Sequence, residues 1–312
     1  MSATGGPAST SSQALVGSLC FLFASVFWGL NIPLTAALLT VFDPFWLALV
    51  RYVIAASLLG TLVAVSLGPR ALRPPIAVWR VGIMGLCVSL FLVSFTVGLM
   101  LTHPVTAAAV MAGSPVYVAL VSRVMNGTGL ARGFVPATLL TISGAAIAIS
   151  GRAEAGFNFR GGELLLVASL ASWTTYSIFA QRWFLSGVPQ LRRTWLGAAA
   201  AIPWLGVFWV IARVLGVAGP PQLEPDTRSI AYLLITAMLS TAISTVAWNI
   251  GVSRLGIAVG GLWQNTVPVF AVLLSFLLLG VVPTGAQMLG GTVVLCGVAI
   301  MQWHALRAFR RS

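Results

Sequence analysis

Charged residues are scarce in this 312-residue chain, and lysine is absent altogether. Only 7% of the residues are charged, whereas a soluble domain of this length typically carries about 25%. The five acidic residues are outnumbered by seventeen basic ones, all of them arginine. Such a deficit excludes an ordinary soluble surface, so we expect the lipid bilayer to be the main solvent of this protein.

Cysteine is also scarce, and there is no polar segment in which basic residues gather. Cys20, Cys87 and Cys296 lie far apart inside apolar runs without CxxC spacing, which argues against a disulfide framework and against a metal site. The net charge of +12 could indicate nucleic-acid binding, but the arginines stand singly or in small groups between apolar stretches. We therefore expect no nucleic-acid partner, no metal and no cofactor.

Long apolar runs dominate the chain, which is 59% hydrophobic and has a mean hydropathy of +1.00. A membrane-spanning helix needs about 20 mostly apolar residues, and the runs lack the alternating pattern of a membrane barrel. The sequence therefore predicts an all-α integral membrane protein with ten transmembrane helices and connections too short to hold a soluble domain. The predicted spans are 14–39, 42–66, 79–101, 104–125, 134–151, 163–183, 194–215, 229–252, 255–281 and 285–306.

The arginines predict the orientation of these spans. If both termini are cytoplasmic, most arginines of the connecting segments fall on the cytoplasmic side, as the positive-inside rule requires. Residues 1–13 carry no basic residue, so we interpret them as a disordered cytoplasmic tail rather than a signal peptide. Residues 307–312 form a basic cytoplasmic tail. We expect a multi-pass protein of a bacterial inner membrane. All five acids fall on the outer side, namely Asp43, Glu154, Glu163, Glu224 and Asp226.

Glycines and prolines recur at constant offsets along the chain. With an offset of 153, Gly98, Pro115, Gly127 and Gly144 meet Gly251, Pro268, Gly280 and Gly297. With an offset of 145, Gly17, Leu19 and Trp28 meet Gly162, Leu164 and Trp173. The sequence therefore predicts two five-helix repeats, 14–151 and 163–306, joined by a periplasmic linker at 152–162.

An odd number of spans per repeat has a topological consequence. The second copy must enter the membrane from the opposite face, so the two repeats are inverted. Inverted repeats are characteristic of secondary transporters, whose substrate site lies near the bilayer midplane at the repeat interface. We therefore expect a central cavity between the halves and a small-molecule substrate.

The motifs of both halves resemble a known family. They are 25–29 (SVFWG) in the first span, 113–117 (GSPVY) in the fourth, and 266–270 (TVPVF) in the ninth, followed by a Leu-rich stretch to Gly280, by Gly290-Gly291 and by Gly297-Val298. Over residues 14–306 the chain resembles the drug/metabolite transporter superfamily in its ten-helix EamA-type branch. The resemblance implies ten helices around a central cavity and alternating access.

Within that branch the chain is most similar to bacterial aromatic amino-acid exporters of the YddG type. The resemblance implies export of aromatic or other apolar amino acids. One departure concerns an acidic residue that follows the Leu-rich stretch in many members. Here Gly280 is followed by Val281 and Gly127 by Thr128, so this chain lacks the acid and the role that it has in those members.

Arg51 is the one charge deep within a predicted span. It lies about 13 Å along its helix, where an arginine costs on the order of 3 kcal/mol or more. Its guanidinium could bind a substrate carboxylate through two parallel hydrogen bonds. The alternative is a structural role, in which Arg51 pairs with carbonyl groups at helix ends or extends to the membrane surface.

Aromatic and polar residues in the first and sixth spans are related by the repeat. Trp28 corresponds to Trp173, and Asn31 to Tyr176. The tryptophans could stack on a flat substrate, or they could be packing residues between helices. Gly29 and Pro33 flank Asn31 and predict that the helix opens there, freeing backbone groups for a ligand.

Further candidates lie in spans 3, 4, 8 and 9. Each of these residues could bond to the backbone of its own helix, contact another helix, or line the cavity. A methionine could form a soft wall for an apolar ligand, although packing is the simpler interpretation. These candidates are Phe95, Met111, Ser114, Ser244, Trp248, Trp263, Gln264 and Asn265.

No predicted span carries an aspartate or glutamate in its interior, since Glu163 lies at the outer end of span 6. Proton-coupled pumps usually move protons through such residues, so facilitated diffusion of a zwitterion or weak acid is favoured. The alternatives are a broad exporter of neutral drugs or nucleobases, a channel, and a membrane enzyme. We expect no catalytic residues, because paired carboxylates, histidine clusters and Ser/His dyads are missing from the spans. The oligomeric state stays open, with a monomer favoured.

Overall fold

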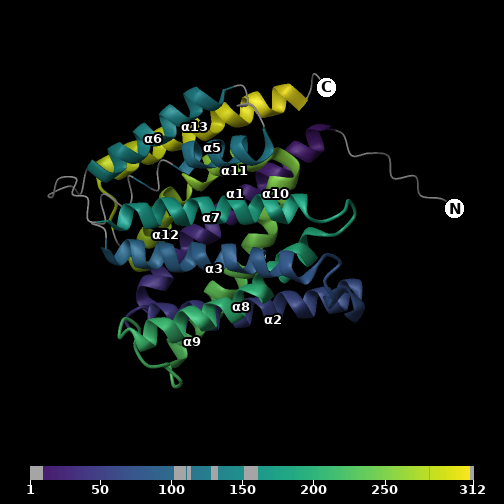
Figure 1. Cartoon of the computed structure of the whole chain (residues 1–312). Helices are drawn as coiled ribbons and strands as arrows, with labels where there is room; N and C mark the ends of the chain where they lie inside the picture. Colours follow the sequence, from purple (N-terminus) through teal and green to yellow (C-terminus); the bar gives the residue numbers. More distant parts are fainter. Residues whose placement is uncertain are drawn as a thin grey trace.

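A computed structural model describes residues 10–101, 110, 114–127, 133–150, 161–280 and 282–309. Within these ranges the chain is helical and contains no strand, as the sequence predicts, and the long helices run roughly parallel (Figure 1). The first half contains α1 (Thr10–Leu38), α2 (Pro44–Leu67), the short η1 (Pro69–Leu72), α3 (Val78–Leu101), α5 (Ser114–Asn126) and α6 (Phe134–Ser150). The second half contains α7 (Gly162–Arg182), α8 (Gln190–Val214), α9 (Thr227–Ile235), η2 (Thr236–Ile243), α10 (Ser244–Leu255), α11 (Ile257–Gln264), α12 (Val267–Leu279) and α13 (Gly285–Phe309).

The lengths and compositions of these helices fit a membrane protein. Among the described residues, seven helical segments are long and apolar enough to cross a membrane, and shorter apolar helices cover 114–125, 134–148 and 285–301. Each of the ten predicted spans coincides with one of these segments. Apolar side chains such as Val65, Leu164 and Leu277 are largely exposed on the helix surfaces, where lipid tails would cover them. The predicted fold class is confirmed.

Two predicted helix boundaries are wrong. Helix α1 begins at Thr10, so residues 10–13 are helical rather than part of a disordered tail, and α13 continues to Phe309. The predicted ninth span is also broken, between α11 and α12. Pro268, near the start of α12, has no N–H to donate to the carbonyl group of Gln264, and the chain turns there.

The eighth span contains an eight-residue π-helix, η2, which the sequence did not predict. Hydroxyl groups support it: Thr241 donates to the carbonyl oxygen of Thr236 at 3.0 Å, and Ser244 donates to that of Leu239 at 2.8 Å. Both acceptors lie five residues before the donor, which matches the wider π-helical turn. Because π-helical turns are frequent at functional sites, η2 indicates that the eighth span contributes to one.

The helix contacts of one repeat recur when each helix is replaced by its counterpart in the other repeat. Helix α1 packs on α10 as α3 packs on α7, and α1 packs on α12 as α5 packs on α7. The corresponding pairs α2 and α8, and α6 and α13, pack on each other and lie side by side in Figure 1. A two-fold exchange of spans 1–5 with spans 6–10 produces this pattern. The halves are thus interlaced rather than forming separate lobes.

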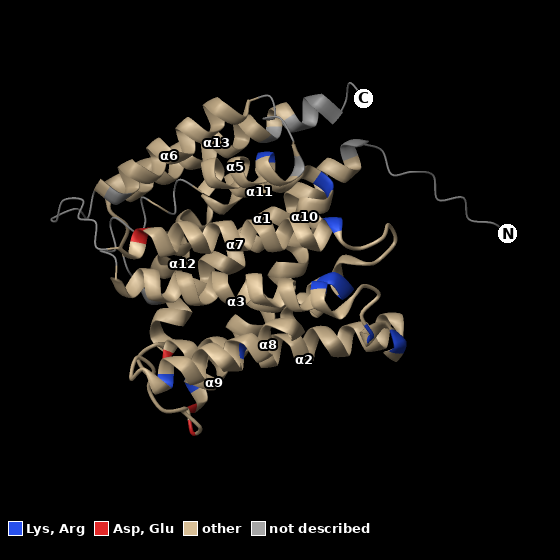
Figure 2. Cartoon of the chain, viewed as in Figure 1, with Lys and Arg blue, Asp and Glu red and all other residues tan. Residues whose placement is uncertain are grey.

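Charge is distributed unevenly between the two ends of the helix bundle. Most of the blue residues in Figure 2 lie at the end where the described chain begins and ends, and the red residues lie at the opposite end. Two acids at that opposite end cap helices: Asp43 accepts from the N–H groups of Phe45 and Trp46, and Asp226 accepts from that of Ser229. The hydrogen bonds from Ser229 hold the pKa of Asp226 below its ordinary value.

Arg193 is a buried arginine at the start of the seventh span. Helix α8 begins at Gln190, four residues before the predicted span 194–215, so Arg193 lies in its first turn, where it is 7% exposed. Its guanidinium donates to the carbonyl oxygens of residues at the end of α7 and in the following turn, namely Ala180, Gln181, Leu185 and Val188. A buried arginine is therefore used to satisfy a helix terminus.

The contact between α6 and α13 depends on glycine. A Cβ atom on Gly144 would lie 2.6 Å from the carbonyl oxygen of Gly290 and 2.7 Å from the nitrogen of Val294, which is too close for any side chain. We expect Gly144→Leu to destabilise the folded protein by about 2 kcal/mol or more, measured as a lower thermal-unfolding midpoint in detergent. Ala146→Leu, at an exposed position on the same helix, is the control and should unfold like the wild type.

Candidate functional site

Three tryptophans from α1, α7 and α10 meet in the centre of the described helices. The ring centroids of Trp28 and Trp173 are 5.7 Å apart in an edge-to-face arrangement, and Trp248 lies 5.3 Å from Trp28 and 6.1 Å from Trp173. Phe91 and Tyr176 extend the cluster, at 5.1 and 5.3 Å from Trp173. Such spacings are favourable for aromatic packing and leave flat ring faces on which a planar ligand could stack.

The position of the Trp28–Trp173 pair follows from the repeat. Two residues that exchange under a two-fold axis can touch each other only if both lie close to that axis. Trp28 and Trp173 correspond to each other at an offset of 145 and are in contact. Their contact therefore lies near the interface of the two halves, where inverted-repeat transporters bind their substrates.

The three indole N–H groups have different environments. Trp28 donates to the carbonyl oxygen of Ser240 in η2 at 2.9 Å, and the Ser240 hydroxyl donates back to the carbonyl oxygen of Phe27 at 2.8 Å. Trp248 donates to the Ser177 hydroxyl at 3.0 Å. The indole nitrogen of Trp173 is buried and has no hydrogen-bond partner among the described residues. A buried donor without a partner is costly, so a bound polar group would stabilise it.

A cavity lies beside this cluster, between α2, α3, α7, α8 and the eighth span. Its volume is about 10 Å³, which is close to what a single water molecule requires. The side chains around it therefore leave little free space. The lining residues are Tyr52, Val88, Trp173, Tyr176, Thr194, Ala198, Thr241 and Thr245.

Hydroxyl groups make one wall of this cavity polar without adding charge. Asn249 is fully buried and donates to the Tyr176 hydroxyl at 3.1 Å and to the Thr194 hydroxyl at 2.9 Å. The Thr194 hydroxyl in turn donates a hydrogen bond to the carbonyl oxygen of Gln190. For the Tyr176 proton the described residues offer no acceptor, so the tyrosine is held in place by Asn249 and remains able to donate to a ligand.

The sequence does not identify Tyr52 and Thr194 as members of this site, and nothing in the local sequence distinguishes Thr194 from a packing residue. Asn249 lies next to the candidate Trp248 in the eighth span, and an asparagine inside a span needs partners on other helices. Tyr52 could have been found from its position next to Arg51, which places it on an adjacent face of α2.

Arg51 binds to α1 rather than lining the cavity. Its terminal nitrogen donates to the side-chain oxygens of Asn31 at 3.2 Å and Thr35 at 3.1 Å, and Thr35 donates to Asn31 at 3.1 Å. The Arg51 Nε atom is buried without a partner, and the described residues provide no carboxylate partner for the guanidinium. Arg51 is thus a cation that α1 holds in a fixed orientation and that has no anionic partner among the described residues.

The expected opening of the first span at Asn31 is wrong. Helix α1 is continuous through Pro33. Gly29 serves a different purpose, because a Cβ atom there would lie 2.6 Å from the Phe270 side chain and 2.9 Å from the nitrogen of Ala271. The absence of a side chain allows α12 to approach α1 closely.

The candidates of spans 4 and 9 form a contact between α5 and α11. Ser114 donates to the side-chain oxygen of Asn265 at 3.1 Å, so these two residues bind each other across the helices. The indole nitrogen of Trp263 and the side-chain oxygen of Gln264 are buried and have no partner among the described residues. These two atoms are therefore available to a polar ligand, whereas Ser114 and Asn265 already satisfy each other.

Three further candidates have simpler surroundings or lie outside the described ranges. Phe95 stacks on Phe91 at 6.0 Å and so belongs to the edge of the aromatic cluster. Ser244 bonds the backbone of its own helix, which is the alternative the sequence left open. Met111 lies outside the described residues.

Carboxylates are confined to the ends of the described spans. Glu163 lies in the first turn of α7, where it is 6% exposed and accepts from the N–H group of Gly161 at 2.8 Å. Asp43 and Asp226 precede the helices that they cap. Within the part of the chain that the structure describes, the interior of the spans therefore contains cations and neutral polar groups but no acid.

Interlaced inverted repeats, a membrane-spanning length and a polar site at the repeat interface together define a multi-pass membrane transporter. Comparison with known families agrees: the model of the EamA-like transporter family matches residues 15–150 and again residues 160–303. The chain belongs to the EamA-like transporter family, within the drug/metabolite transporter superfamily. The two matches fall on the two predicted repeats, and the resemblance inferred from the sequence motifs is confirmed.

Curated relatives point to export of amino acids. The chain is 23% identical over 304 residues to the aromatic amino acid exporter YddG of Ancylobacter novellus, covering 96% of this chain and all of that protein. It is 28% identical over 212 residues to a probable terminal-alkyne amino-acid exporter of Streptantibioticus cattleyicolor and 24% identical over 207 residues to the uncharacterized transporter YyaM of Bacillus subtilis. These two alignments cover 66% and 65% of this chain, and 67% and 66% of the relatives, respectively.

The same fold occurs among solved structures. One crystal structure superposes with a TM-score of 0.77 at 21% sequence identity, covering 96% of this chain and 99% of the other. At this level of identity the match shows a shared fold and carries no information about the substrate.

Proposed function

We propose that this protein exports aromatic or other apolar amino acids across the bacterial inner membrane by alternating access. The observation that carries the proposal is the contact of Trp28 with Trp173 near the exchange axis of the repeats, next to a cavity with unused hydrogen-bond donors. In this proposal both termini are cytoplasmic, residues 14–151 and 163–306 are the two repeats, and the transporter works as a monomer.

The chemistry of the site suits an amino acid with a flat side chain. The tryptophan rings would stack on that side chain, and Arg51, which lacks an anionic partner among the described residues, would bind the carboxylate. The ammonium group of the substrate would donate to neutral oxygens, because none of the residues that line the cavity is acidic. YddG of Ancylobacter novellus, an aromatic amino acid exporter, supports this substrate class.

The absence of carboxylates from the interior of the described spans supports facilitated diffusion. Proton-coupled carriers usually move protons through buried acids, and the described cavity has none. The substrate would then move down its own gradient, which fits export from a cell that accumulates it. In the proposed cycle, the site between the two repeats opens alternately to the two sides of the membrane.

Uptake of labelled phenylalanine or tryptophan into liposomes that contain the purified protein tests the proposal. We expect saturable uptake that accelerates when unlabelled substrate is present on the opposite side, and the same rate with and without a pH gradient. Dependence on the gradient would overturn facilitated diffusion while keeping the carrier. Absence of uptake would overturn the substrate class, and neutral drugs and nucleobases would be tested next.

A single hydroxyl group offers a sharper test of the cavity. We expect Tyr176→Phe to raise the half-saturation concentration for phenylalanine about fivefold, because a substrate loses one neutral hydrogen bond worth about 1 kcal/mol. The ring remains and Asn249 keeps its bond to Thr194, so the fold should be retained. Tyr232→Phe, on the α9 surface, is the control and should leave the half-saturation concentration unchanged.

A further inference from the structure

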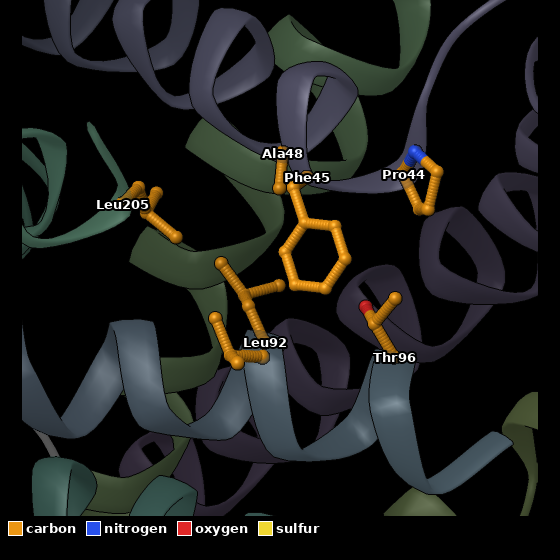
Figure 3. A pocket seen from close by; sticks show the side chains of 7 residues that line it. Pro44, Phe45, Ala48, Leu92, Thr96 and Leu205 are labelled. Carbon is orange, nitrogen blue, oxygen red and sulfur yellow. The ribbon is translucent and has the colours of Figure 1, made fainter. Parts of the chain in front are cut away.

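Helix α3 carries two features that the proposed transport site does not use. Its residues Leu92, Val93 and Thr96 line a cavity against α2 and α8, where the Phe45 ring points toward Leu92 (Figure 3). The volume of this cavity is about 10 Å³, room for about one water molecule, so it cannot hold a larger ligand. The other feature is Arg80, in the first turn of α3, whose surroundings point to a ligand outside the described chain.

The Arg80 guanidinium lies against two tryptophan rings. Its Cζ atom is 5.2 Å from the centroid of the Trp79 ring and 5.9 Å from that of Trp183, which follows the last residue of α7. The two rings are 6.0 Å apart in an edge-to-face arrangement, and Phe179 stacks on Trp183 at 3.8 Å. Cation–π contacts within about 6 Å are attractive. The aromatic rings therefore restrict where the charge of Arg80 can lie.

The positive charge of Arg80 is not neutralised within the part of the chain that the structure describes. The acids lie at the opposite end of the helix bundle (Figure 2). The Arg80 Nε atom is buried and has no hydrogen-bond partner among the described residues. Arg192 differs, because it donates to the carbonyl oxygens of Ala71 and Arg73 at 2.7 Å. A guanidinium with unused donors and no anion would be stabilised by a bound anion.

The surface next to Arg80 is apolar and faces outward. Val78 is 73% exposed and Trp79 is 60% exposed. Both belong to the first turn of a helix that is long and apolar enough to cross a membrane, so lipid would cover their side chains. Tryptophan is enriched where acyl chains meet the headgroups. An anion bound to Arg80 would therefore lie at the level of the headgroups, beside the acyl chains.

We propose that Arg80, held by Trp79 and Trp183, binds the phosphate group of an anionic phospholipid at the arginine-rich end of the bundle. The guanidinium N–H groups match the oxygens of a phosphate, and Val78 and Trp79 contact the adjoining acyl chain. Basic pockets at the ends of membrane helices recognise anionic headgroups in this way. Phosphatidylglycerol is favoured over phosphatidylcholine, because the choline cation of the latter offsets the phosphate charge. The site is separate from the transport site, and its occupant is not the exported molecule.

Thermal unfolding of the purified protein in detergent tests the lipid site. Dioleoylphosphatidylglycerol should raise the unfolding midpoint saturably, and dioleoylphosphatidylcholine should raise it much less, since a ligand that binds the folded state stabilises it. Arg80→Gln should increase the half-saturating concentration of phosphatidylglycerol about tenfold, because it removes a charge-assisted hydrogen bond. Arg80→Lys keeps the charge but loses the planar donor group, so its value should lie between those of Arg80→Gln and the wild type.

A matched control separates a defined site from general attraction between arginines and anionic lipid. Arg70→Gln removes one charge from an exposed residue at the same end of the bundle and should change the half-saturating concentration by less than about twofold. Equal losses in Arg70→Gln and Arg80→Gln would overturn the site. Equal stabilisation of the wild type by phosphatidylcholine, or by inorganic phosphate alone, would overturn an anionic lipid as the ligand.

A second variant applies if Arg80→Gln does not fold. Trp79→Leu changes a largely exposed ring, so the fold should be retained, and it removes one of the two rings that hold Arg80. The half-saturating concentration of phosphatidylglycerol should rise about threefold. An unchanged value in Trp79→Leu would overturn the proposal.

Discussion

Export of phenylalanine by the Arg51→Gln variant is expected to fall about 100-fold below that of the wild type. Hydrogen bonds to charged groups contribute about 1.5–3 kcal/mol, and a bidentate arginine–carboxylate pair has two of them. Glutamine keeps a donor for Asn31 and Thr35 but removes the charge that a substrate carboxylate would neutralise. Flux into liposomes at saturating and subsaturating phenylalanine measures the effect.

Two comparisons distinguish a substrate anchor from a structural tie between α1 and α2. Binding of phenethylamine, which lacks the carboxylate, should be the same in Arg51→Gln and the wild type. Arg228→Gln, at the surface of α9, serves as the control for a lost positive charge. If Arg51→Gln folds and transports phenylalanine normally, Arg51 does not bind the substrate. Equal losses for phenylalanine and phenethylamine would assign it to packing instead.

Removing the central tryptophan ring should have the second-largest effect. Trp173→Ala is expected to raise the half-saturation concentration for tryptophan about 30-fold, or about 2 kcal/mol, as for aromatic residues that dominate other binding sites. Trp173 contacts Trp28, Trp248, Phe91 and Tyr176 and lines the cavity. Initial rates of labelled tryptophan uptake over a range of concentrations provide the measurement.

Trp173→Phe separates the contributions of the ring and the indole N–H. The phenylalanine ring keeps much of the stacking surface but cannot donate the hydrogen bond that Trp173 leaves unused among the described residues. An intermediate half-saturation concentration is expected. Trp303→Ala, at a 57% exposed position of α13, is the control for loss of a tryptophan. Loss of folded protein in Trp173→Ala, with normal transport by Trp173→Phe, would favour a packing role.

The π-helical segment η2 lies between α9 and α10 in the eighth span and contacts the tryptophan cluster. Ser240 and Trp28 bind each other's helices through two hydrogen bonds, so a shift of η2 along its axis would move the tryptophan cluster. A π-helical turn holds one more residue than an α-helical turn, and conversion between the two changes the register of everything that follows. The two hydrogen bonds thus link η2 in the eighth span directly to Trp28 of the tryptophan cluster.

One unpartnered polar group lies on the wall of the cavity. The indole nitrogen of Trp173 is buried without a partner among the described residues, and Trp173 lines the cavity. Buried polar groups in folded proteins are usually hydrogen-bonded. A polar ligand in the cavity would therefore satisfy this N–H group.

Composition and periodicity by themselves determined the architecture. A membrane protein must satisfy its backbone hydrogen bonds within helices, so apolar length alone located the ten spans, and glycine, proline and tryptophan at constant offsets identified the repeat. The same offset paired Trp28 with Trp173, which the structure brings into contact. Helix ends were less predictable, because hydropathy does not locate them: α1 begins at Thr10, and α8 begins at Gln190, where Arg193 bonds to carbonyl groups at the end of α7.

Only the tertiary structure decided which polar groups meet. Arg51 donates to Asn31 and Thr35, and Asn249 donates to Tyr176 and Thr194. Trp28 donates to a carbonyl group in η2 that lies more than 200 residues away in the sequence. Side-chain partners depend on how helices pack and rotate, and the spacing within one helix does not contain that information.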